Sequence, residues 1–100
     1  MMKLTELEER FRNVALIRGG VFLLSTADAL RFVNACQRAG VRISGIEGFR
    51  VDGERIQPLQ EHSVDYHQSQ EGNHEDGAAF LISRHGEELW FEVVTEDREA

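Results

Sequence analysis

The sequence contains little that marks a secreted or membrane-inserted chain. Its 100 residues include a single cysteine, Cys36, which excludes an intramolecular disulfide and fits a reducing compartment. The longest apolar runs, 21–24 and 78–82, have the length of a strand, whereas a bilayer-spanning helix needs roughly 20 residues. The charged segment 1–10 lacks the apolar centre of a secretory signal. We therefore expect a cytoplasmic protein that does not associate with membranes.

Basic residues are also scarce, with 11 Lys and Arg against 18 Asp and Glu and a net charge of −7. Residues 1–50 carry eight basic and five acidic side chains, and residues 51–100 carry three and thirteen, so the second half has a balance of −10. Binding to nucleic acid needs clustered Lys and Arg, so we expect no direct contact with nucleic acid. The asymmetry indicates either an acidic face or acidic side chains at solvated outer positions of the second half.

Two segments have the apolar spacing of helices. Residues 3–14 predict a short N-terminal helix, because apolar side chains recur along one stripe. Residues 26–39 predict a long helix, with Ser25 as its N-cap and Gly40 ending it in the left-handed conformation. We expect its core face to contain Ala29, Phe32, Val33, Cys36 and Ala39. Cys36 is then a small core residue rather than a nucleophile.

Strand-like segments flank the long helix. The run "VFLLS" at 21–25 precedes it and "VRISGIEGF" at 41–49 follows it, so together they predict a βαβ unit. Gly45 and Gly48 interrupt the second strand, where we expect a bulge or a bend.

The middle of the chain predicts a hairpin and then a long loop. Asp52 and Gly53 form a two-residue loop suited to a type I′ turn. Pro58 has no N–H to donate, so we expect strand pairing to stop there. Residues 59–77 have few apolar side chains and no periodicity, which predicts a long, polar, acidic loop.

The last third of the sequence allows two interpretations. Residues 78–84 form either a short helix that ends near Gly86 or the first strand of a hairpin with "ELWFEVVTE" at 88–96. We favour the hairpin, because Phe, Leu and Ile in a row suit a strand. The whole chain, 1–100, then predicts a single α+β domain. Its mixed sheet has four to five strands and one βαβ unit, with the long helix packed on one face and the short N-terminal helix beside it.

A search for catalytic or metal-binding motifs gives little. His62, His67 and His74 lie in the segment 61–77 with five acidic residues and no cation, but their spacing matches no zinc motif. No serine lies in a nucleophile elbow, and Glu47 stands alone between glycines without a phosphate-binding pattern. We therefore expect no enzyme activity, no bound metal and no cofactor. A small metal-dependent or acid–base enzyme using the histidines and Glu47 remains an open alternative.

The segment 61–77 and the last strand instead have the composition of a protein-contact surface. Carboxylates attract a basic partner, and aromatic side chains ringed by polar groups are the usual anchors of interfaces. Trp90 could also belong to a second small core. The residues that we predict to contact a partner are Asp65, Tyr66, Glu71, Glu75, Asp76, Trp90 and Glu92.

The order of these segments resembles small immunity proteins of bacterial polymorphic-toxin and contact-dependent inhibition systems. The resemblance lies in the strand and helix at 21–39, the "GVRISGIEGF" strand at 40–49 and the closing acidic strand "ELWFEVVTE". It implies a cytoplasmic, non-enzymatic protein that binds and neutralises a cognate toxin domain, often a nuclease. It implies no particular contact residues. A general protein-interaction or regulatory module without a toxin partner is the alternative, and the sequence does not decide the oligomeric state.

Overall fold

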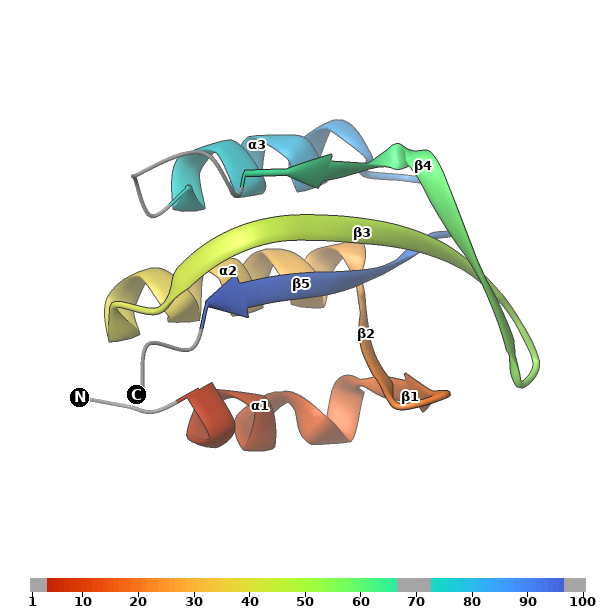
Figure 1. The fold of residues 1–100 in the computed structure, drawn as a ribbon, viewed down its shortest axis with the longest axis horizontal. Helices are drawn as coiled ribbons and strands as arrows, with labels where there is room; N and C mark the ends of the chain where they lie inside the picture. Colours follow the sequence, from red (N-terminus) through yellow and green to blue (C-terminus); the bar gives the residue numbers. More distant parts are fainter. Residues whose placement is uncertain (1–3, 67–72, 97–100) are drawn as a thin grey trace.

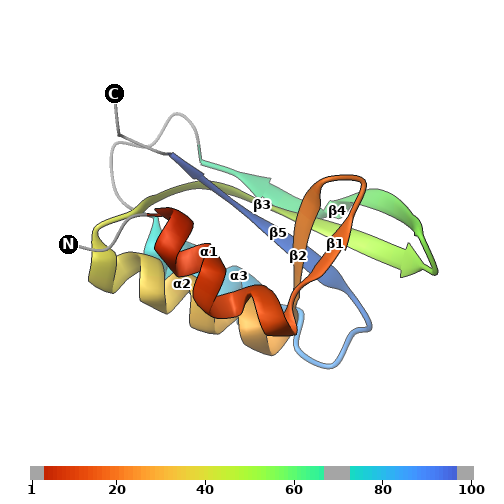
Figure 2. The same ribbon diagram turned by 90° about the horizontal axis from the view of Figure 1, so that it is seen from below.

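The computed structural model of this chain describes residues 4–66 and 73–96. Five strands form one sheet in the order β1-β2-β5-β3-β4, and every pair of neighbours is antiparallel. The helices of the described residues lie on one side of this sheet, and no helix covers the other side, which we call the open face (Figures 1 and 2). The elements are α1 (Leu4–Phe11), the 3-10 turn η1 (Arg12–Val14), β1 (Leu16–Arg18), β2 (Val21–Ser25), α2 (Thr26–Ala39), β3 (Arg42–Asp52), β4 (Arg55–Asp65), α3 (His74–Ser83) and β5 (Trp90–Glu96).

The predicted α+β class, long helix and N-terminal helix are confirmed. The βαβ unit is β2-α2-β3, but its two strands are not neighbours. Both pair antiparallel with β5, so they run parallel to each other with β5 between them. We expected a mixed sheet, but the two parallel strands of the βαβ unit, β2 and β3, are separated by β5 and do not pair with each other.

Local signals defined α2 well. The N–H of Asp28 donates to Ser25 Oγ at 3.3 Å, and Gly40 has a φ of 74°, which is the left-handed helix end that was expected. Phe32, Val33 and Cys36 are buried beneath the helix. Burial raises the pKa of the Cys36 thiol to about 12, which is the behaviour of a core residue rather than a nucleophile.

The prediction of a loop over 59–77 was wrong for most of its length. The segment begins as strand β4, which continues through Pro58 to Asp65, and it ends inside α3. Pairing does not stop at Pro58 because β4 is an edge strand, where a missing N–H can face away from the sheet. The hairpin loop lies one residue later than expected, at Gly53 and Glu54, between the paired residues Asp52 and Arg55. Residues 67–72 lie outside the described part of the chain.

The prediction of a strand at 78–84 was also wrong, because these residues belong mainly to α3. Gly77 and Leu81, four residues apart, are buried, whereas Ile82 is 60% exposed. The helix begins at Asn73, whose side-chain amide donates to the backbone oxygen of Ile43 at 2.6 Å. This contact joins residues 30 positions apart, so packing on β3 and α2 overrides the strand preference of Phe, Leu and Ile.

A second hairpin, β1-β2, was not predicted as such. Its loop is Gly19 and Gly20, both with positive φ, which is the pattern of a type I′ turn. The Nε–H of Arg18 donates to the backbone oxygen of Gly53 at 3.0 Å and so joins this hairpin to the tip of the β3-β4 hairpin.

The main core lies between the sheet and the helices, with Phe91 of β5 completely buried near its centre. Phe80 of α3 packs edge-on against Phe91 with ring centroids 6.3 Å apart. Leu23 and Phe49 are buried as well but lie outside this cluster. Phe49 is directly opposite Trp90 in the β3-β5 pair, so these side chains share the face of the sheet that points away from the helices. Trp90 is only half-buried there.

Candidate binding groove on the open face of the sheet

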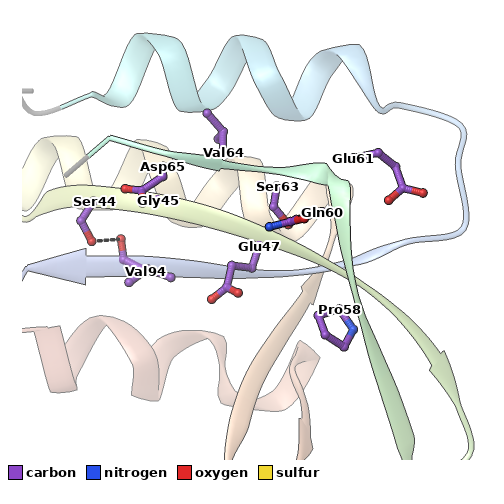
Figure 3. A pocket seen from close by; sticks show the side chains of 10 residues that line it. All are labelled: Ser44, Gly45, Glu47, Pro58, Gln60, Glu61, Ser63, Val64, Asp65 and Val94. Atoms are coloured by element: carbon purple, nitrogen blue, oxygen red, sulfur yellow. Dashed lines mark hydrogen bonds between the residues drawn. The ribbon is translucent and has the colours of Figure 1, made fainter. Parts of the chain in front are cut away.

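A large bulge in β4 shapes the open face. Ile46 of β3 pairs with Val64, and Gly48 pairs with Leu59, so the single residue Glu47 stands against four residues of β4, 60–63. Extra residues on one strand bend it away from its partner and redirect its side chains. Figure 3 shows β4 turning sharply at this point.

Ser63 holds the bulge in place. Its hydroxyl donates to the backbone oxygen of Leu59 at 2.8 Å and accepts from the N–H of Gly48 at 3.1 Å. Gly48 lies so close to β4 that a Cβ added to it would stand 2.8 Å from the Cβ of His62. The expectation of a bulge or bend at Gly45 and Gly48 is therefore confirmed, and it now has a physical reason: a close approach of two backbones.

The bulge and the three strands around it form a groove (Figure 3). Ser44 on its floor donates to the backbone oxygen of Val94 at 3.3 Å, which ties β3 to β5 beneath the groove. Pro58 and Val94 give it apolar patches, whereas the side chain of Val64 points towards α3 (Figure 3) and packs against the main core. The residues that line it are Ser44, Gly45, Glu47, Pro58, Gln60, Glu61, Ser63, Val64, Asp65 and Val94.

The charges of the groove are all of one sign. Glu47, Glu61 and Asp65 line it, and no Lys, Arg or His is among the described residues that do so. Their carboxylates are spread along the groove rather than gathered at one point (Figure 3). Within 4–66 and 73–96 no group of three or more His, Cys, Asp or Glu side chains is placed to hold a metal ion. Carboxylates spread along the groove in this way suit several separate cationic groups better than a single metal ion.

Glu92 adds a fourth carboxylate beside the groove. It lies directly opposite Glu47 in the β3-β5 pair, on the same face as Val94. Partial burial raises the pKa of Glu92, and the negative charge of Glu47 and a hydrogen bond between the two carboxyl groups raise it further. Two like charges held this close repel each other at neutral pH, and a cation bound between them would relieve that repulsion.

We expect Glu92→Gln to raise the free energy of unfolding at pH 7 by roughly 0.5 kcal/mol, because it removes this repulsion. A carboxyl group with a raised folded-state pKa contributes stability below its ordinary pKa of 4.5 and loses that contribution as the pH rises through the folded value. The gain from Glu92→Gln should therefore vanish near pH 4. Urea unfolding at both pH values measures it, with Glu88→Gln, an exposed position outside the strands, as the control. A gain of equal size at both pH values would contradict the repulsion.

Neither of the two aromatic residues that we predicted as anchors is among the residues that line the groove. The N–H of Tyr66 donates to the backbone oxygen of Ser44, and its ring packs partly against the main core. Burial raises the pKa of the Tyr66 hydroxyl, and the nearby charge of Asp76 raises it further. Asp65 pairs with Gly45 of β3, and Trp90 pairs with Phe49 of the same strand. These two positions of β3 are four residues apart, which is about 13 Å along the strand.

The structure thus places Asp65, Trp90 and Glu92 on the open face, whereas the ring of Tyr66 packs against the main core on the helix side. Glu75 and Asp76 are exposed in the first turn of α3, and only Asp76 is near another predicted residue, Tyr66. Glu71 lies outside the described residues.

Sequence reasoning missed part of the groove, namely Ser44, Pro58, Gln60, Glu61 and Ser63. Glu47 had been considered only as an acid–base residue. The one available signal was the pair Gly45 and Gly48, which marked the part of β3 that faces the bulge but not the residues that β4 places there.

His62 and His74, the two histidines of the segment 61–77 that the structure describes, have separate structural contacts. Nε2–H of His74 donates to the backbone oxygen of Val41 at 2.7 Å, so this side chain fastens α3 to the start of β3. His62 lies on β4, with its Nε2 atom 3.8 Å from Glu87. His67 is outside the described residues.

No family model, curated protein or solved structure matches this chain. None of the helices in the described part of the chain is long and apolar enough to cross a membrane. The fold is that of an α+β domain, and the groove lies on the face of its sheet that points away from the helices. This face is the basis for the function proposed below.

Proposed function

We propose that this chain is a non-enzymatic binding domain that occludes the basic surface of a partner protein, and that it serves as an immunity protein against a cognate bacterial toxin. The observation that carries the proposal is the groove on the open sheet face, which has three carboxylates among its lining residues, Glu92 beside it and no cation among the described lining residues.

Electrostatics favours a nucleic-acid-cleaving toxin as the partner. A nuclease must attract a polyanion, so the surface around its active site is basic. A complementary acidic surface steers association and raises its rate towards roughly 10⁸–10⁹ M⁻¹s⁻¹ at low salt. Rapid association is useful to an inhibitor that must act before the toxin does.

The geometry of the groove supplies what affinity requires besides charge. Pro58 and Val94 offer apolar contact area, and the half-buried Trp90 lies at one end of the same face. Large aromatic side chains supply most of the binding energy in many interfaces, while charged groups at the rim mainly affect the rate. Trp90 is therefore the residue that we expect to anchor the partner, with Glu47, Glu61 and Asp65 steering it.

The test begins with the reading frames next to the one that encodes this chain: a candidate toxin domain found there is co-expressed with the chain, and binding is measured by calorimetry at about 50 mM and about 500 mM salt. We expect the double charge reversal Glu47→Lys and Glu61→Lys to weaken binding at least about 100-fold at low salt. Its control is Glu6→Lys with Glu9→Lys, two exposed positions on α1, on the helix side of the sheet. The control has the same change in net charge and should retain most of the affinity.

An equal loss of affinity in both double variants would mean that the total charge of the protein, and not the groove, controls binding. No association at micromolar concentration in low salt would rule out the tested toxin domain as the partner. Binding to a basic protein without protection of cells from a toxin would instead identify the general interaction module.

A further inference from the structure

A second groove lies on the helix side of the molecule and has the opposite charge. It runs between α1 with its following turn η1 and the exposed side of α2. The two helices lie side by side (Figure 2), and Phe11 packs against Phe32 with ring centroids 5.2 Å apart. Three arginines and two asparagines supply its polar side chains. The residues that line it are Arg10, Phe11, Asn13, Val14, Arg31, Asn34, Ala35 and Arg38.

Helix geometry explains why these side chains face one groove. Arg31, Asn34 and Arg38 are spaced by three and four residues on α2, so they lie along one stripe of the helix. Seven residues of helix place the two arginines of this stripe about 10 Å apart. Arg10 and Asn13 approach from the end of α1 on the other side. No carboxylate is among the described residues that line the groove.

The charges of the groove are only partly compensated within the chain. Arg31 pairs with Asp28 at 3.2 Å, and its guanidinium also lies 5.9 Å from the centre of the Phe11 ring. Arg10 takes part in an interaction inside the protein. Arg38 is exposed and forms no ion pair with a residue of the described ranges 4–66 and 73–96. At least one guanidinium is therefore ready to bind an external anion.

We propose that this groove binds a small ligand carrying two or more phosphate groups. Guanidinium groups bind phosphate oxygens through paired N–H donors, and side-chain amides such as those of Asn13 and Asn34 add further donors. The backbone positions of Arg31 and Arg38 are about 10 Å apart on α2, so a ligand with several phosphates can meet each of these arginines with a separate phosphate group. Phe11, Val14 and Ala35 provide an apolar floor beside these donors.

The charge of the whole protein favours a small ligand over a nucleic-acid chain. The net charge is −7, because the balance of −10 in residues 51–100 outweighs the balance of +3 in residues 1–50. A long polyanion that extends beyond the groove meets this repulsion, whereas a ligand confined between α1 and α2 contacts only the basic patch. The basic groove lies on the helix side and the acidic groove on the open sheet face, so the two sites can be filled independently.

Inorganic triphosphate is the probe for the test, titrated into the intact chain at low salt with calorimetry and amide chemical shifts as readouts. We expect a Kd below about 1 mM, with the largest shifts in residues 10–14 and 31–38. Arg38→Gln should weaken binding at least about fivefold, and Arg38→Lys, which keeps the charge but loses the fork of donors, should have an intermediate effect. The matched control is Arg55→Gln, an exposed arginine at the start of β4, which should change Kd less than about twofold.

Three results would overturn the proposal. The first is no binding at a triphosphate concentration of about 5 mM. The second is an equal loss of affinity in the Arg38 and Arg55 variants, and the third is that the largest amide shifts lie outside residues 10–14 and 31–38. If a single-stranded oligonucleotide binds through Arg38 and triphosphate does not, the ligand of this groove is nucleic acid rather than a small phosphate compound. Because none of these variants touches the acidic groove, failure here leaves the proposed binding of a basic partner unaffected.

Discussion

Replacing Gly48 by alanine is expected to destabilise the domain by about 3 kcal/mol. The added Cβ would stand 2.8 Å from the Cβ of His62 and closer still to the His62 backbone oxygen. Backbone atoms cannot move aside as the end of a flexible side chain can, so β4 must shift. That shift would also break the hydrogen bond from Gly48 N–H to Ser63 Oγ, which holds the bulge. Urea-induced unfolding followed by tryptophan fluorescence measures the loss.

Gly45→Ala provides a graded control for the same strand. Its Cβ would stand 3.0 Å from the backbone oxygen of Val64, a milder conflict than the one at Gly48. We therefore expect a smaller loss, of about 1 kcal/mol. A Gly48→Ala variant within about 0.5 kcal/mol of the parent chain would show that the two strands do not approach as closely as described.

Removal of the Phe91 ring should have the other large effect. Phe91 is 0% exposed and packs against Phe80 of α3, so Phe91→Ala leaves a cavity where the sheet meets the helices. Such substitutions cost about 3–5 kcal/mol, which is a large share of the 5–15 kcal/mol that stabilises a typical domain. We expect a strongly lowered midpoint of urea unfolding, measured by circular dichroism.

The neighbouring residue provides the contrast. Trp90 is half-buried on the open face, so Trp90→Ala should cost clearly less stability than Phe91→Ala while weakening the binding of a basic partner. Phe91→Leu, which keeps most of the apolar volume, should retain most of the stability and all of the binding. A larger stability loss from Trp90→Ala than from Phe91→Ala would mean that the open face, not the helix side, contains the main core.

The sequence predicted those parts of the fold that depend on neighbouring residues. Ser25 and Gly40 determine the ends of α2 by local hydrogen bonding and backbone conformation, and both are visible in the sequence. The identity of α3 depends instead on the contact between Asn73 and Ile43, thirty residues apart. Because Phe80 and Ile82 by themselves favour a strand, only that distant packing makes this segment a helix.

The acidic groove shows the same limit more clearly. The sequence showed an excess of carboxylates and singled out Asp65, Trp90 and Glu92, but it did not show that Glu47 and Glu92 are opposite each other. That pairing depends on the register between β3 and β5, which are separated by the whole of β4 and α3. The bulge depends in turn on the close approach allowed by Gly48 and on the hydroxyl of Ser63. Contacts of this kind have no signature in a single sequence.

The central position of β5 has a consequence for the order in which the molecule is assembled. During synthesis β2 and β3 leave the ribosome long before β5, yet the sheet joins them only through β5. Until residues 90–96 are available, the edges of β2 and β3 that β5 will cover are open to wrong partners. Trp90 and Glu92 arrive with the same strand, so the acidic face is completed in the step that closes the sheet. A nascent chain therefore gains its proposed binding surface only when its fold is complete.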